Sequence, residues 1–268
     1  MADCDNNCAA CGVSDCEKRN EIKKLVPHEG TEIKKIYAVI SGKGGVGKSL
    51  VTSLLASALT KKGKKVAIMD ADITGPSIPQ AFGLKDAMAT QDDSGLYGCK
   101  SKLGIKVMSI NLLLEHNEDP IIWRGPIISG FVQQLFTDVN YGKLDYMLID
   151  MPPGTGDVPL TVFQSLPIDG IIVVSSPQEL VSMVVQKSIN MANMMNIPIL
   201  GMVMNMSYVK CPHCGERIEV FNHKEGAGYP LPLLAELPID PLISKLVDEG
   251  NIEDYPSDIF ESVVNALE

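Results

Sequence analysis

Gly42-Lys-Gly-Gly-Val-Gly-Lys-Ser49 fits the phosphate-binding pattern G-x-x-x-x-G-K-[ST], and this octet decides the fold. An apolar, β-rich run, residues 36–40, comes directly before it. Residues 50–59 follow, with apolar side chains at helical spacing. The octet therefore lies between an expected strand and an expected helix, which is the context that a phosphate-binding loop needs. An ordinary glycine-rich turn, the alternative, does not account for this agreement of strand, loop and helix.

The residue types in the octet suit a bound nucleoside triphosphate. Glycines tolerate positive φ and carry no side chain, so successive backbone N–H groups can point inward at the phosphates. The following helix adds the positive end of its dipole. We expect Lys48 to reach the β- and γ-phosphates and the Ser49 hydroxyl to bind Mg²⁺. The expected nucleotide contacts are Gly42, Lys43, Gly44, Gly45, Val46, Gly47, Lys48 and Ser49.

Short apolar runs alternate with helical stretches along the rest of the chain. The runs are nearly continuous in Val, Ile, Leu and Met, which is typical of strands buried on both faces of a parallel sheet. They lie at residues 36–41, 65–70, 105–110, 146–150, 170–175 and 198–204. A capping box that begins at Ser176 predicts a helix to about Asn196. The pattern predicts an α/β fold with a doubly wound, mostly parallel sheet and a ligand at the carboxyl ends of the strands.

The 268 residues suit one large domain with a small extension. We expect residues 1–30 to be a cysteine-rich extension and linker, and residues 31–268 to be the phosphate-loop domain. Two expected strands of this domain end in carboxylates, Asp72 shortly after the run 65–70 and Asp150 at the end of the run 146–150. Oxygen ligands suit Mg²⁺, so both are candidates for the catalytic centre together with Lys48. Asp157, further along, reads equally well as a helix cap or turn residue.

Cys211-Pro-His-Cys214 places two thiols at a spacing that grips one metal ion or one cluster iron. Zinc and [4Fe–4S] sites both need four ligands, and no second C-x-x-C lies nearby. Ligand counting therefore favours two copies of this pair, one from each subunit of a dimer. A redox disulfide and a self-contained zinc knuckle are the alternatives.

The amino-terminal segment carries four more cysteines, Cys4, Cys8, Cys11 and Cys16, among residues that cannot build a core. Only a ligand could order such a segment. A [4Fe–4S] cluster is the first choice and zinc the second, because each takes four cysteines. Cys99 lies apart from both groups, and we expect it to be a free structural cysteine.

Charge and hydropathy narrow the possible partners. The net charge of −10 disfavours nonspecific binding to nucleic acid, which needs a basic surface. No run approaches 18 apolar residues and no signal segment opens the chain, so we expect neither a membrane partner nor export. The expected location is the cytoplasm, where clustered thiols indicate metal or cluster ligands before disulfides. The amphipathic, acidic stretch 259–267 is expected to pack on the domain.

A second lysine in the loop, Lys43, is not part of the plain phosphate-binding pattern. With it, the loop resembles the deviant phosphate loop of the MinD, ParA and nitrogenase-iron-protein class of P-loop NTPases. The resemblance implies that Lys43 reaches across a dimer to the partner's nucleotide. It also implies that Asp150 is the Walker B aspartate, and that Asp72 is the switch I aspartate that orients or activates the attacking water.

Further motifs narrow the resemblance to the Mrp/Nbp-type ATPases, which are cytosolic carriers or scaffolds for iron–sulfur clusters. These motifs are Trp123-Arg-Gly-Pro126, Asp150-Met-Pro-Pro-Gly-Thr-Gly-Asp157 and the late C-x-x-C pair. The resemblance implies a homodimer that binds ATP and Mg²⁺, hydrolyses ATP slowly and passes [4Fe–4S] clusters to apo-proteins. It assigns one bridging cluster to Cys211 and Cys214 of two subunits, and adenine recognition to Asn205. The Nbp branch also has an amino-terminal four-cysteine motif, but the gap from Cys4 to Cys8 is shorter here.

Two other functions are compatible with parts of the sequence. One is a positioning ATPase of the MinD/ParA kind with structural zinc at the cysteines, which the acidic charge and the lack of a basic patch disfavour. The other is an ATP-gated electron-transfer protein similar to the nitrogenase iron protein, which a bridging cluster does not exclude.

Overall fold

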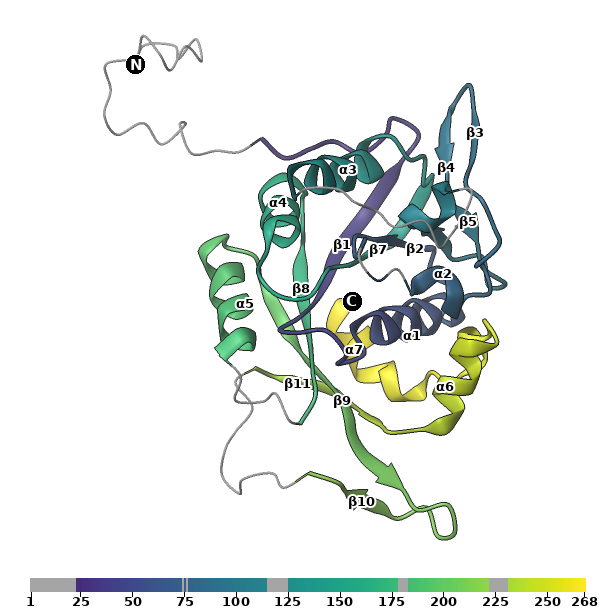
Figure 1. Ribbon diagram of the computed structural model, residues 1–268, viewed down its shortest axis with the longest axis vertical. Helices are drawn as coiled ribbons and strands as arrows, with labels where there is room; N and C mark the ends of the chain where they lie inside the picture. Colours follow the sequence, from purple (N-terminus) through teal and green to yellow (C-terminus); the bar gives the residue numbers. More distant parts are fainter. Residues whose placement is uncertain (1–22, 74, 76, 115–124, 178–182, 222–230) are drawn as a thin grey trace, which may run out of the picture.

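A twisted central sheet forms the body of the protein in the computed structural model, which describes residues 23–73, 75, 77–114, 125–177, 183–221 and 231–268 (Figure 1). Within these residues nine strands form one sheet in the order β10-β9-β8-β1-β7-β2-β6-β5, with β11 paired to β9. The strands are β1 (Glu32–Ser41), β2 (Val66–Asp70), β5 (Cys99–Lys100), β6 (Lys106–Met108), β7 (Lys143–Asp150), β8 (Gly170–Ser175), β9 (Ile199–Lys210), β10 (Arg217–Glu219) and β11 (Leu233–Pro238). A separate hairpin joins β3 (Thr90–Asp92) to β4 (Gly95–Tyr97).

The sheet is mostly parallel, as the sequence predicts. Strand β1 lies at its centre and pairs in parallel with β7 and with β8, while β2 pairs in parallel with β7. Only β5 and β10, at the two edges of the described sheet, pair antiparallel to their neighbours. The carboxyl ends of β1, β2 and β7 therefore meet at one edge of the sheet, where a doubly wound fold binds its ligand.

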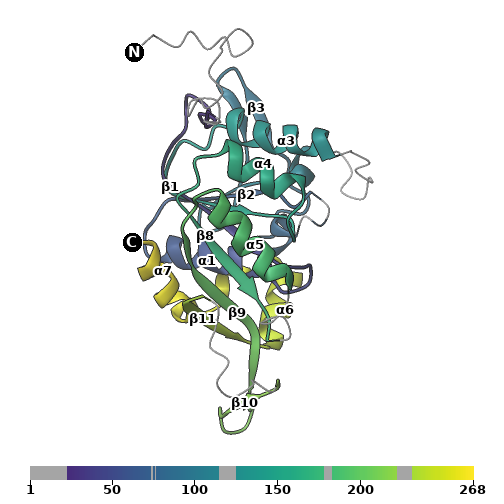
Figure 2. The same cartoon turned by 90° about the vertical axis from the view of Figure 1, so that its left-hand side faces the viewer.

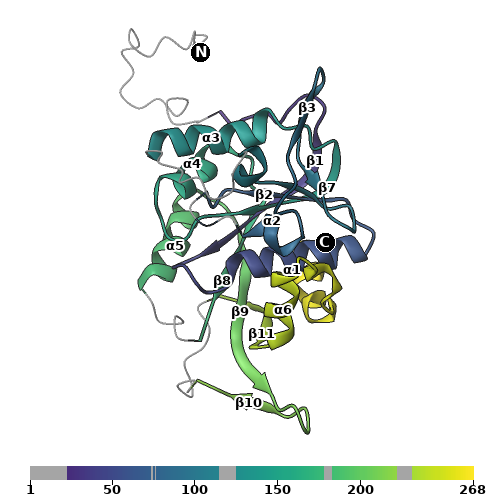
Figure 3. The same cartoon turned by 45° about the vertical axis from the view of Figure 1, so that its right-hand side comes forward.

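Helices cover both faces of the sheet (Figures 2 and 3). One layer comprises α1 (Lys48–Lys61), α2 (Ile78–Ala81), α6 (Pro241–Asp248) and α7 (Glu261–Leu267), and the other comprises α3 (Gly125–Thr137), α4 (Asp157–Ser165) and α5 (Met183–Met194). Alternate residues of β1 serve the two layers: Tyr37 and Val39 belong to the α1 core, and Ala38 belongs to the α4 core. This two-sided burial explains why the strands are nearly continuous apolar runs.

The six strands expected from the sequence are all present, and only β8 has the expected ends, because β1 and β7 begin earlier, at Glu32 and Lys143, and the other three also differ. Strand β6 stops at Met108 because a 3₁₀ turn, 110–113, follows. Strand β9 continues to Lys210, so Asn205, expected just past a strand, lies inside one. The expected helix after Ser176 corresponds to α5, although residues 178–182 lie outside the described part of the chain. The stretch 259–267 ends a 3₁₀ turn, 258–260, and then forms α7, which packs on α1 and β11 and confirms the expectation for this stretch.

Residues near the start of the described chain already form hydrogen bonds to the domain. The Leu25 backbone N–H donates to the Ser165 carbonyl at the end of α4 over 2.7 Å. The cysteines at 4, 8, 11 and 16 and the segment at Trp123 lie outside the described residues. None of the described helices is long and apolar enough to cross a membrane.

Two glycines with positive φ provide a matched test of backbone packing. Gly250 has φ 69°, and a Cβ there would lie 2.4 Å from the Cα of Gly83, whereas Gly63 has φ 81° with open space around it. We expect Gly63→Ala to lose about 1 kcal/mol of unfolding free energy through left-handed backbone strain alone. Gly250→Ala should lose about 1–3 kcal/mol more through overpacking, measured by urea denaturation. Equal losses for the two variants would contradict this packing of α6 on α2.

Candidate nucleotide and metal sites

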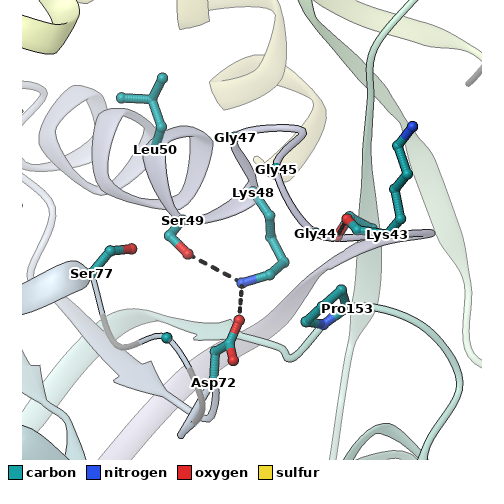
Figure 4. A pocket seen from close by; sticks show the side chains of 12 residues that line it. Lys43, Gly44, Gly45, Gly47, Lys48, Ser49, Leu50, Asp72, Ser77 and Pro153 are labelled. Atoms are coloured by element: carbon teal, nitrogen blue, oxygen red, sulfur yellow. Dashed lines mark hydrogen bonds and ion pairs between the residues drawn. The ribbon is translucent and has the colours of Figure 1, made fainter. Parts of the chain in front are cut away.

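The octet forms the loop between β1 and α1, and its glycines adopt the backbone that the sequence predicts. Gly45 has φ 83° and Gly47 has φ 82°, both in the left-handed region that favours glycine. Gly47 is the N-cap of α1, and its carbonyl accepts the first helical bond from the Val51 N–H at 2.9 Å. The amino end of α1 therefore faces a cavity of about 440 Å³ (Figure 4). This geometry suits phosphate groups, which bind backbone N–H groups at a helix start.

Lys48 is buried in this cavity among carboxylates. Its Nζ lies 2.8 Å from Asp150 Oδ2 and 3.5 Å from Asp72 Oδ2, and it donates to Ser49 Oγ at 3.2 Å. Figure 4 shows the Lys48 ammonium between the loop and Asp72. A buried ammonium needs compensating negative charge, and here the two carboxylates supply it. Phosphate oxygens at the loop would offer the same ammonium an alternative set of anionic acceptors.

Asp150, at the end of β7, is fully buried and held by α1. Its Oδ2 accepts from Ser49 Oγ at 2.6 Å, and its Oδ1 accepts from Thr52 Oγ1 at 2.8 Å. The Ser49 hydroxyl and the Asp150 carboxylate are thus adjacent oxygen donors at the mouth of the phosphate loop. Mg²⁺ favours such oxygen ligands, so these two residues fit the ion that the sequence predicts. The sequence did not predict the hydrogen bond from Thr52 to Asp150. Its only signal in the sequence is a hydroxyl residue one helical turn after Lys48.

The structure adds a third carboxylate, Asp70, that the sequence analysis did not single out. It ends β2 directly opposite Asp150 in the parallel register. Its oxygens accept from the Asp72 N–H at 3.1 Å and from Ser109 Oγ at 3.0 Å. Burial, and then the nearby charge of Asp150, raise the pKa of Asp70 well above its ordinary value. The signal for Asp70 was its place at the end of an apolar run beside another carboxylate-ended strand.

Asn205 connects β9 to the phosphate loop. Its Nδ2 donates to the Val46 carbonyl at 2.9 Å, and the side chain is almost fully buried. A Cβ on Gly47 would lie 2.1 Å from this Nδ2, so only glycine leaves room for the amide. In this structure Asn205 fixes the position of the loop through this hydrogen bond. Its role in adenine recognition stays a prediction.

Lys43, the second loop lysine, is exposed and differs from Lys48 in direction. Figure 4 shows its side chain extending away from Lys48 and Asp72. Gly44 and Gly45 are also exposed, whereas Gly42 and Val46 are buried. The role of Lys43 across a dimer stays a prediction.

Cys211 and Cys214 lie in the turn between β9 and β10, at the end of the molecule remote from α3 (Figure 1). The Cys211 N–H donates to the Glu216 carbonyl at 2.8 Å, and its carbonyl accepts from the Gly215 N–H at 2.9 Å. Backbone N–H groups of Cys214 and then His213 hold the pKa of the Cys211 thiol below its usual value. Both cysteines are free, and Cys214 is exposed. Such a turn favours the thiolate form that metals and clusters need.

The described residues contain no group of three or more His, Cys, Asp or Glu side chains placed to hold a metal ion. Within that part of the chain, Cys211 and Cys214 therefore supply two ligands and no more. The amino-terminal cysteines lie outside it. Cys99 is free and half-buried in β5, as expected, and burial raises the pKa of its thiol.

The loop, the carboxylates at the strand ends and the parallel sheet define a P-loop NTPase of the MinD/ParA-like class. The family described as "ParA: NUBPL iron-transfer P-loop NTPase" matches residues 32–267, and the chain belongs to this family. The chain is 46% identical to the iron-sulfur cluster carrier protein of Clostridium perfringens, over 93% of this chain and 94% of that protein. It is 39% identical to the cytosolic Fe-S cluster assembly factor CFD1 of Kluyveromyces lactis, over 84% and 83% of the two chains.

A solved structure agrees with the fold. The nucleotide-binding protein of Archaeoglobus fulgidus in complex with ADP superposes with a TM-score of 0.76 at 46% identity. The match covers 85% of this chain and 91% of that one. The predicted fold class and family are thereby confirmed.

The buried Asp70 carboxyl predicts a pH-dependent effect on stability. Because its folded-state pKa is raised, the folded state binds more protons than the unfolded state as pH rises above the ordinary carboxyl value. That part of the stability is lost with rising pH, by about 1.4 kcal/mol per pH unit until the folded pKa is reached. Asp70→Asn removes this loss, so the variant should gain stability relative to the parent as pH rises from 4 to 8 in urea titrations.

Asp92→Asn is the matched control. Asp92 is exposed, and hydrogen bonds from Ser94 lower its pKa, so its contribution to stability changes only at acid pH and this variant should stay flat relative to the parent above about pH 5. A stability difference for Asp70→Asn that stays flat or falls with pH would refute a buried, proton-binding Asp70.

Proposed function

We propose that the protein is an ATP-binding, slowly ATP-hydrolysing homodimer of the cytoplasm that carries [4Fe–4S] clusters and transfers them to apo-proteins. The observation that carries this proposal is a pair of free thiols, half-buried Cys211 and exposed Cys214, that can supply half of a cluster's ligands on a chain with a phosphate-loop cavity. The family is described as iron-transfer NTPases, and the carrier and assembly-factor names of the relatives support the same cargo. Nucleic acid and membrane are not partners in this proposal.

The nucleotide site suggests how ATP would act on the chain. When the nucleotide binds, the Lys48 ammonium would move from the carboxylates of Asp72 and Asp150 to the phosphate oxygens. One ammonium group cannot form strong hydrogen bonds with both carboxylates and the phosphates at once. Ser49 and Asp150 would hold Mg²⁺, which bridges and neutralises phosphate oxygens. Asp72, released from Lys48, could then orient the attacking water. Lys43 would contact the nucleotide of the other subunit.

Two elements connect this site to the rest of the molecule. The Gly154 N–H, in the segment after β7, donates to the Ser41 carbonyl at the loop over 3.0 Å, and α4 begins three residues later. Strand β9 holds the loop through Asn205 and ends directly before Cys211. Six residues of strand span at most roughly 20 Å, so one continuous strand links nucleotide and cluster ligands. Nucleotide state and cluster binding would then be coupled reciprocally.

The amino-terminal cysteines Cys4, Cys8, Cys11 and Cys16 complete the proposal. Four thiols within thirteen residues can hold one further [4Fe–4S] cluster in each subunit without help from the partner. This segment lies outside the described residues, so the assignment rests on the cysteine pattern alone.

Substituting Cys211 tests the bridging cluster. After anaerobic reconstitution, Cys211→Ser should carry about four fewer irons per dimer than the parent, because one four-iron cluster is lost. Binding of a fluorescent ATP analogue should be retained, since the phosphate loop is intact, with an affinity changed only by the coupling between nucleotide and cluster. Cys99→Ser is the control and should keep its full iron content. Full iron in Cys211→Ser, or zinc without sulfide in the parent, would contradict the cluster carrier and favour a structural-zinc ATPase.

Substituting Lys43 tests the dimeric nucleotide site. Lys43→Gln should retain ATP binding within about a few-fold, because Lys48 and the loop N–H groups remain. Its hydrolysis rate should fall at least about tenfold, since a cation at the phosphates is missing from the transition state. Lys48→Gln, in contrast, should lose ATP binding itself. Unchanged hydrolysis in Lys43→Gln would refute a role across the dimer.

A further inference from the structure

A second cavity, of about 380 Å³, lies at the amino-terminal ends of β2 and β7. The nucleotide site lies at the opposite, carboxyl ends of these strands. Four lysines line it, Lys64, Lys65, Lys106 and Lys143, and we call it the lysine cavity. The phosphate loop begins α1, whereas Lys64 and Lys65 follow the end of that helix. A helix of 14 residues is roughly 21 Å long, so the two cavities are separate sites.

The carboxylates near the lysine cavity sit at its rim and do not neutralise all four ammonium groups. Lys64 pairs with Glu268 at 2.7 Å between partly exposed side chains, and Lys143 pairs with Glu32 at 3.4 Å between largely exposed ones. Exposed ion pairs of this kind contribute little to stability, so another anion can replace either carboxylate at little cost. Asp145 is also close, but its carboxylate pairs with Lys34 at 2.7 Å and accepts the Lys65 backbone N–H.

Lys65 and Lys106 carry the least compensated charge. No side-chain partner for the Lys65 ammonium occurs among the described residues, and the Lys106 ammonium donates to the Tyr141 carbonyl, a neutral acceptor. Burial, and then the positive charges of Lys100 and Lys65, lower the pKa of Lys106. Gathering like charges around a cavity is unfavourable in the free protein, and a bound anion would relieve it. This cluster also stands out in a chain whose net charge is −10.

We propose that the lysine cavity binds a small organic anion with two or more phosphate or carboxylate groups. Its volume lies within the range of small-molecule sites, and lysine ammonium groups are effective partners for phosphate oxygens. Gly104, on the wall, has φ 88° and open space at its Cβ position, so a ligand can approach the backbone closely. The charges line a cavity instead of an extended stripe, which suits a metabolite better than nucleic acid.

The test titrates the full-length protein, with its nucleotide site filled by Mg·ADP, with inorganic pyrophosphate and separately with citrate. Isothermal titration calorimetry should show binding of at least one probe, and the probe that binds identifies phosphate or carboxylate chemistry. The double variant Lys65→Gln/Lys106→Gln should weaken that binding by about tenfold or more, because each lysine offers a charge-assisted hydrogen bond. Lys187→Gln/Lys245→Gln removes the same charge outside the cavity and should leave the affinity unchanged.

A second measurement needs no variant. Acetylation of lysines by a water-soluble reagent, followed by mass spectrometry, should show Lys65 and Lys106 protected by the binding probe and Lys245 unprotected. Absence of binding by both probes, or binding with equal affinity in the double variant and no protection of Lys65, would overturn the proposal. Neither outcome depends on cluster binding, so failure here leaves the proposed function standing.

Discussion

The ion pair between Lys48 and Asp150 joins the three parts of the nucleotide site that the chain supplies separately. Lys48 begins α1, Asp150 ends β7, and the ammonium also approaches Asp72 after β2. With Asp70 opposite Asp150, three carboxylates and one ammonium share a small buried volume. One ammonium cannot compensate three buried carboxylates, and burial disfavours each charge that lacks a partner. Binding of a divalent cation and a triphosphate would change all of these ion pairs and hydrogen bonds together. A small ligand would in this way alter the contacts along the whole carboxyl edge of the sheet.

Strand β9 connects the nucleotide site to the surface of the molecule. Asn205 holds the loop at Val46, and the strand then continues to the turn that carries Cys211 and Cys214. Met206, directly after Asn205, has φ 54°, an unusual backbone for a residue with a side chain. The pairing of β9 with β11 shifts register between Glu236 and Pro238, in the same region. Backbone strain at this point, between the nucleotide and the thiols, is consistent with a segment that changes conformation when the loop does.

The sequence predicted the parts of the structure that depend on local pattern. Buried parallel strands leave nearly continuous apolar runs, and the phosphate loop needs its glycines and lysine at fixed spacing, so both were visible. Asp70 was missed because its significance arises from the register between β2 and β7, which no local pattern records. The extension of β9 past Asn205 was missed because the polar residues there interrupt the apolar run. The lysine cavity was equally hidden, since Lys65, Lys106 and Lys143 lie far apart in the sequence.

In the proposed function, two copies of the chain complete one cluster site. Native mass spectrometry tests it most directly on an anaerobically reconstituted variant with serine at Cys4, Cys8, Cys11 and Cys16, which leaves the C-x-x-C pair as the only clustered thiols. We expect a dimer whose mass exceeds that of two polypeptides by one [4Fe–4S] cluster, and which dissociates when the cluster is removed by oxidation. A monomer that retains a cluster or a zinc ion, or a dimer that carries neither, would contradict it.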